Sequence, residues 1–180
     1  MEIFELVLAL LSTIPEGIKG RTVLQKLGYF ASVKLKIDAG YAADFYGPYS
    51  PAVAEHLQNM VELDFVVEKG RQTLHNRTMY NYSLTEDGLE LAKKVKEEYP
   101  KEYAVVRNIV RKCGRTVHCN YNVLSWAAKV HFVLHRADKA MTRAEAIDAS
   151  QSFGWKLDQE EVESAVRLLL ALGLIKERAR

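Results

Sequence analysis

Most residues in this sequence that could bind a soft metal ion lie close together in its second half. The group consists of Cys113, His118, Cys119, His131 and His135. The two histidines one helical turn apart could share a metal ion, but two cysteines separated by five residues do not have zinc-finger spacing. The alternative is a half-buried thiol and two ordinary helix histidines. We therefore expect no metal site and no cofactor.

None of the common catalytic motifs occurs in the sequence. It has no phosphate-binding glycine loop, no Gly-x-Ser-x-Gly elbow and no His-Glu-x-x-His helix. Cys119 follows His118, but adjacency in sequence does not establish pairing in space. We therefore expect no catalytic residues and a protein that is not an enzyme.

Polar side chains on an expected helix over residues 50–63 could contact DNA bases. Its outward positions include His56, Gln58 and Asn59. Such side chains can hydrogen-bond base edges in the major groove. Glu55 and Glu62 share this surface and would repel phosphate groups, so the alternative is a solvated face of a structural helix.

Two further groups of residues are basic and could contact phosphate. In and beside a polar loop between two expected strands the basic residues are Lys69, Arg71 and Arg77. One face of an expected helix over Tyr99–Arg115 carries Arg107, Arg111, Lys112 and Arg115. That helix could lie along a phosphate backbone, or pair with the acidic segment Asp158–Glu163 within the chain or across a dimer.

The order of expected elements places the polar face of the helix over residues 50–63 next to the basic loop between the two strands. Helices over residues 2–11, 20–35 and 50–63 precede strands at 65–69 and 80–84. Thr85 then caps a further helix, and residues 37–47 fit either a strand or an extended loop. This order predicts a winged helix with a trailing helix over residues 1–99.

The second half of the chain repeats part of this pattern. Aligning Val53–Lys69 with Val162–Arg178 pairs apolar positions at a constant offset, and capping-box patterns at Thr142 and Asp158 predict two helix starts. We therefore expect residues 100–180 to hold a helical segment and a second helix-turn-helix-like unit. The expected fold class is mainly α with small β-hairpins, a winged helix-turn-helix built as two tandem winged-helix-like units.

Charge is divided unevenly along the chain. Residues 1–99 carry a net charge of −3, residues 100–143 carry +7, and residues 144–180 carry −2. An anionic partner is therefore expected to bind the middle of the sequence.

No stretch approaches the roughly 18–20 uninterrupted apolar residues of a membrane span. The two cysteines are too few for a disulfide framework, so we expect a soluble, cytoplasmic protein that does not bind membranes.

Two motifs resemble a known family. The runs Gly20–Leu27 (GRTVLQKL) and Phe45–Pro51 (FYGPYSP) are similar to the signature pair of YwgA-like prokaryotic winged-helix proteins. They are also similar to Panacea-type, phage-associated antitoxin-like domains. The resemblance covers most of the chain, and it implies a winged-helix fold and a role in regulation.

These observations lead to two hypotheses about function. The first is a winged-helix transcriptional regulator that binds double-stranded DNA as a homodimer. The second is a protein-interaction module, antitoxin-like or an adaptor, that keeps the winged-helix core without binding DNA. The charge on the expected recognition helices distinguishes them, and Glu55 and Glu62 favour the second.

Overall fold

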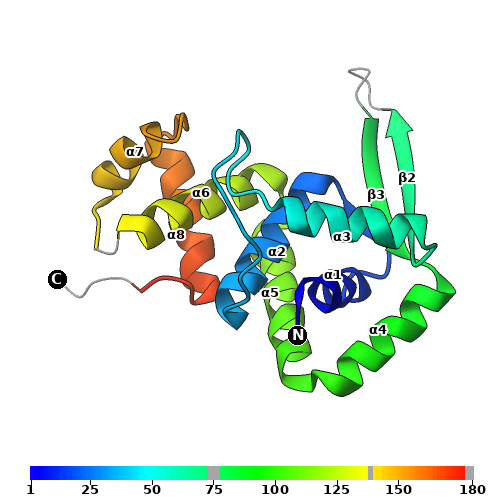
Figure 1. The fold of residues 1–180 in the computed structure, drawn as a ribbon. Helices are drawn as coiled ribbons and strands as arrows, with labels where there is room; N and C mark the ends of the chain where they lie inside the picture. Colours follow the sequence, from blue (N-terminus) through cyan, green and yellow to red (C-terminus); the bar gives the residue numbers. More distant parts are fainter. Residues whose placement is uncertain (73–77, 138–139, 177–180) are drawn as a thin grey trace.

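The computed structural model describes residues 1–72, 78–137 and 140–176. Within these ranges the chain is mainly helical and contains a small three-stranded antiparallel sheet (Figure 1). The elements are α1 (Ile3–Ser12), β1 (Ile18–Lys19), α2 (Arg21–Leu35), α3 (Pro51–Glu62), β2 (Val66–Gln72), β3 (Thr78–Leu84), α4 (Glu86–Glu98), α5 (Pro100–Val117), α6 (Tyr121–Ala137), α7 (Arg143–Gln151) and α8 (Gln159–Leu172).

Helix α1 is buried among the elements of the first half of the chain and α5. All six residues from Leu6 to Leu11 are at most 1% exposed. A helix that is apolar on every side must be surrounded by other elements, and α1 packs against α2, α3, α4, α5 and β3. The same helix thereby positions α3 on one side and α5 on another.

The sheet has the strand order β1-β3-β2 and packs on this core. Strands β2 and β3 pair from Val66↔Leu84 to Gln72↔Thr78, and the short β1 joins through Ile18↔Tyr82. The hairpin strands are longer than expected. Strand β1 was not expected at all, because two residues are too few to show alternation in sequence.

The helix starts follow the local capping signals. The Ser50 and Thr85 hydroxyls accept hydrogen bonds from the backbone N–H groups of Val53 and Gly88, at 3.1 and 3.0 Å. The capping boxes that begin at Thr142 and Asp158 are also confirmed. Residues 37–47 form an extended loop rather than a strand, with a single bridge between Ala42 and Tyr49.

The similarity between the two halves extends to helices α3 and α8 but not to a following strand. Met60 and Leu169 are both fully buried at equivalent positions, whereas Leu63 is 62% exposed and its equivalent Leu172 is 3% exposed. Residues 173–176, the last that the structure describes, form a turn and bends. The second unit therefore presents no strand after α8 in the described part of the chain.

The two halves share one core. Helix α2 packs on both α5 and α6, and α8 packs on α5 and α6. Helix α3 packs on α1, α2 and β2, whereas α5 packs on α1, α2, α4 and α8, so α1 and α2 separate α3 from α5. No helix in the described ranges is long and apolar enough to cross a membrane.

Candidate functional site

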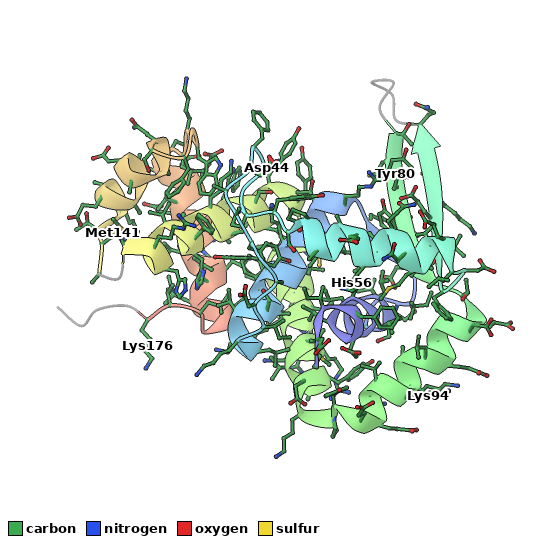
Figure 2. The ribbon with its side chains drawn as sticks, viewed as in Figure 1. Asp44, His56, Tyr80, Lys94, Met141 and Lys176 are labelled. Carbon is green, nitrogen blue, oxygen red and sulfur yellow. The ribbon has the colours of Figure 1, made fainter. Side chains whose placement is uncertain are left out.

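The outer face of α3 is polar and acidic. Glu55, Gln58, Asn59 and Glu62 are exposed, and α3 contains no lysine or arginine. Gln58 Nε2 donates to Glu62 Oε1 at 3.1 Å, so this amide is already engaged. His56 is half-buried and lies on the side of α3 that faces α1, with its ring edge-on to Phe4 at 6.2 Å between centroids (Figure 2). Of the three side chains expected to contact bases, Asn59 alone is exposed with no side-chain hydrogen bond to another described residue.

The β2–β3 hairpin carries two of the three expected phosphate contacts on exposed positions. Lys69 and Arg71 lie on β2 and are exposed, while Arg77 falls outside the described residues. The hairpin lies beside α3, as the expected order of elements predicted (Figure 1).

A further arginine, Arg21, lies beside the hairpin and was not expected at the site. Its Nε donates to the Tyr82 hydroxyl at 2.7 Å, and its Nη2 forms an ion pair with Glu68 Oε2 at 3.2 Å. The guanidinium also lies over the Tyr80 ring, 4.9 Å from its centroid. A cleft of about 320 Å³ opens between α2, α3 and the sheet at this point, with Tyr49 and Glu55 in its wall. The Arg21 guanidinium is therefore already engaged by Tyr82, Glu68 and Tyr80.

The loop between α2 and α3 (residues 36–50, hereafter the α2–α3 loop) exposes aromatic side chains. Phe45 is 76% exposed and Tyr46 is 53% exposed. Their rings pack edge-to-face with centroids 4.9 Å apart. Figure 2 shows the neighbouring Asp44 near the outer end of this loop. The loop therefore presents an aromatic pair to solvent.

Buried polar side chains hold this loop in place. The Gln25 side-chain amide donates to Ser50 O and accepts from Ser50 N, both at 3.0 Å. Lys26 Nζ donates to Pro48 O at 2.8 Å, and Trp155 Nε1 donates to Asp44 O at 2.7 Å. Gln25 and Lys26 are only 4% and 2% exposed, and burial lowers the pKa of Lys26 to about 8. The two sequence motifs thus meet in space, because the first supplies the side chains that hold the second.

The basic residues of α5 form an exposed face on another side of the molecule. Arg107, Arg111 and Arg115 are exposed and Lys112 is half-buried. Arg111 Nη2 donates to Asn108 Oδ1 at 2.8 Å. Among the described residues no ion pair joins this face to Asp158–Glu163, so the expected pairing within the chain is not observed there. Helices α3 and α5 both pack on α1 and α2, so the α5 arginines and the outer face of α3 belong to different surfaces.

Of the five residues that could bind a soft metal ion, Cys113 and His131 are buried, Cys119 is half-buried, and His118 and His135 are exposed. His131 is buried and its Nδ1 pairs with the Tyr29 hydroxyl at 2.8 Å, while His135 stacks on it at 5.9 Å between ring centroids. Burial lowers the pKa of His131 to about 4. Burial also raises the pKa of the Cys113 and Cys119 thiols, which disfavours the reactive thiolate. In the described ranges no group of three or more His, Cys, Asp or Glu side chains is arranged to hold a metal ion.

Comparison with known proteins adds no assignment to these surfaces. No protein-family model and no curated protein matches the chain. The similarity of the two motifs to YwgA-like and Panacea-type proteins therefore remains a resemblance. The function has to be inferred from the α3 face, the α2–α3 loop, the hairpin and the α5 face.

Proposed function

We propose that residues 1–99 form a winged helix that binds another protein through the α2–α3 loop and the outer face of α3. The order α1-β1-α2-α3-β2-β3 and the strand order β1-β3-β2 support the fold, with the β2–β3 hairpin as the wing. The resemblance to winged-helix families supports it as well. Cys113 and Cys119 are free thiols, which suits a function in the reducing cytoplasm.

The main observation behind this proposal is that the Phe45–Tyr46 pair is exposed on a loop whose backbone is hydrogen-bonded to buried side chains. Exposure of large aromatic side chains to water is unfavourable, and their burial against a partner contributes favourable binding free energy. Aromatic residues accordingly supply much of the binding energy of many protein interfaces. Gln25, Lys26 and Trp155 fix the backbone that carries the pair. A loop already ordered in the free protein loses less conformational entropy on binding.

The charge of α3 supports a protein partner over DNA. Glu55 and Glu62 on its exposed face would repel the phosphate groups that supply most nonspecific affinity for DNA. The same carboxylates would complement basic side chains on a protein and would exclude acidic competitors. This partner would make the chain an antitoxin-like or adaptor module, as the second hypothesis holds.

Binding of duplex DNA by the same face is the second candidate. Asn59 is available to contact bases, and Lys69 and Arg71 on the adjacent hairpin are available to contact phosphate. A transcriptional regulator of this kind would act as a homodimer on paired half-sites. Under this candidate Lys69→Glu with Arg71→Glu abolishes DNA binding, and Asn59→Ala relaxes sequence preference with little change in salt dependence.

The protein-binding proposal is tested by affinity capture followed by direct titration. The full chain is used as bait, captured proteins are identified, and each is produced and titrated calorimetrically against the wild type and variants. We expect Phe45→Ala with Tyr46→Ala to weaken the partner's affinity by about 30-fold or more, as for interface anchors worth about 2 kcal/mol or more.

The control is Leu89→Ala, which removes an exposed apolar side chain from α4 and should leave affinity unchanged. Both variants should retain the wild-type circular dichroism spectrum. A partner whose affinity is the same for the loop variant and the wild type would contradict the proposal.

A further inference from the structure

The outer side of α5 carries regularly spaced arginines without acidic neighbours in sequence. No Asp or Glu occurs between Glu102 and Asp138, a stretch that includes nearly all of α5 and all of α6. Arg107, Arg111 and Arg115 follow one another at intervals of four residues and are all exposed. Four residues advance an α-helix by about 6 Å, so the three guanidinium groups form a row along one side of α5.

No described residue forms an ion pair with this row. The ion pair found among the described residues joins Arg21 to Glu68 and involves no residue of this row. The contact of Arg111 with Asn108 is with a neutral amide. Like charges four residues apart destabilise a helix, so the row costs the folded protein free energy that an external polyanion would recover.

A lysine lies at each edge of the row. Lys112 is half-buried next to Arg111 on one edge. On the other edge, Lys19 and His118 line a cavity of about 470 Å³ together with Val110 and Gly114 of α5. Glu16 is the one carboxylate among the residues that line this cavity. Lysines therefore flank the row on both sides, and Lys19, the one toward β1, shares its cavity with Glu16.

We propose that the α5 arginine row binds the phosphate backbone of double-stranded DNA without sequence preference, at a surface separate from the protein-binding face. Arginine donates two parallel hydrogen bonds to a phosphate group, and neutralised phosphates release condensed counterions. Because α1 and α2 lie between α5 and α3, DNA and a protein partner occupy different sides of the molecule. The two can then be bound at the same time.

Fluorescence anisotropy with a labelled random-sequence duplex, measured at several salt concentrations, tests the proposal. The test variant is Arg107→Glu with Arg111→Glu and Arg115→Glu. The matched control is Lys93→Glu with Lys94→Glu and Lys96→Glu, which changes the net charge equally on exposed positions of α4. A second test variant with glutamine at the three arginine positions avoids the added repulsion and guards against misfolding.

We expect wild-type protein to bind at low salt and the α5 glutamate variant to lose at least tenfold in affinity, with the control within about twofold of wild type. Loss of three phosphate contacts should also lower the slope of log affinity against log salt by about 2–3. The glutamine variant should show the same slope change. Undetectable wild-type binding at low salt, or equal losses in test and control variants, overturns the proposal. It is also overturned if Lys69→Glu with Arg71→Glu abolishes binding while the α5 variants bind normally, because DNA then lies on the hairpin.

Discussion

Gln25 and Lys26 are buried polar residues that determine the course of a loop far from them in sequence. Each bonds to main-chain atoms of the α2–α3 loop, at Ser50 and Pro48. Sequence patterns place polar residues at the surface unless a partner is known, and these partners lie 22 and 25 residues away. The burial of Lys26 could not therefore be predicted from local sequence. The sequence contains both motifs, but it does not show that side chains of the first contact the backbone of the second.

We predict that Gln25→Leu lowers the free energy of unfolding by about 1–3 kcal/mol, because the buried N–H of Ser50 loses its acceptor. The Ser50 carbonyl keeps a hydrogen bond from Ala54 N, so it is not left unpaired. Urea unfolding monitored by circular dichroism measures the change. Gln58→Leu, at an exposed position, is the control and should change stability by less than about 0.5 kcal/mol. Equal effects of the two substitutions would show that the Gln25 contact contributes nothing.

His131 makes stability depend on pH in a defined window. Burial lowers its pKa in the folded protein to about 4, below the ordinary value near 6.5. The unfolded chain therefore binds the proton more readily between these pH values. The contribution of neutral His131 to the free energy of unfolding is fully present above about pH 6.5 and is lost as the pH decreases toward 4. We predict a loss of about 2–3 kcal/mol between pH 7 and pH 4.5 from this group.

His131→Asn isolates this contribution, because an amide oxygen can still accept from the Tyr29 hydroxyl but does not titrate. Urea unfolding of the wild type and the variant at both pH values gives the difference. If the two proteins lose the same stability on acidification, His131 is not the responsible group.

At the scale of the elements, local signals predicted the helices well and the connections poorly. Ser50, Thr85, Thr142 and Asp158 begin helices because their side-chain oxygens accept from backbone N–H groups a turn later, an interaction contained in four consecutive residues. Strand β1 depends instead on Tyr82, more than sixty residues away, as its partner. Helix α8 ends where Gly173 adopts the left-handed conformation at φ 67°, and residues 173–176 form a turn and bends.

The close approach of α4 to Phe65, the residue before β2, gives a prediction with a control of opposite sign. A Cβ atom at Gly88 would overlap the backbone oxygen of Phe65, so Gly88→Ala must displace α4 or the segment that leads into β2. We predict a destabilisation of about 1–3 kcal/mol or more. Gly114, in the interior of α5, has open space at its Cβ position, and Gly114→Ala should stabilise by about 0.5–1 kcal/mol. Thermal unfolding measures both changes, and a neutral Gly88→Ala would contradict the packing at this contact.

At the scale of the whole molecule, the sequence identified the basic groups but not their placement. Segment charges located the excess of cations in residues 100–143, and the helical period placed the arginines on one face of α5. Tertiary packing places α1 and α2 between this face and α3, and no local sequence pattern predicts that arrangement. This packing supports the proposal that α3 and α5 serve separate binding surfaces.

The shared core leads to a prediction about cooperativity. A single cluster of buried apolar side chains includes Leu10 and Phe30 from the first half and Ile109, Leu124 and Leu169 from the second. Without residues 100–180, the α2 surface that α5 and α6 cover would be exposed, including Tyr29 at its contact with His131. We therefore predict that the chain unfolds in one transition and that residues 1–99 do not fold alone, although the sequence suggested a boundary at residue 99.

Both tryptophans, Trp126 and Trp155, lie in the second half, so their fluorescence reports on residues 100–180, whereas far-UV circular dichroism reports on both halves. Coincident urea midpoints from the two probes are expected. Hydrogen exchange adds a residue-level measurement, in which the amides of α1 and α8 should share the protection expected for global unfolding. Two separated midpoints, with α1 still protected after Trp155 becomes exposed, would instead establish two units that fold independently. The shared apolar contacts across α2 would then contribute little to the stability of the first half.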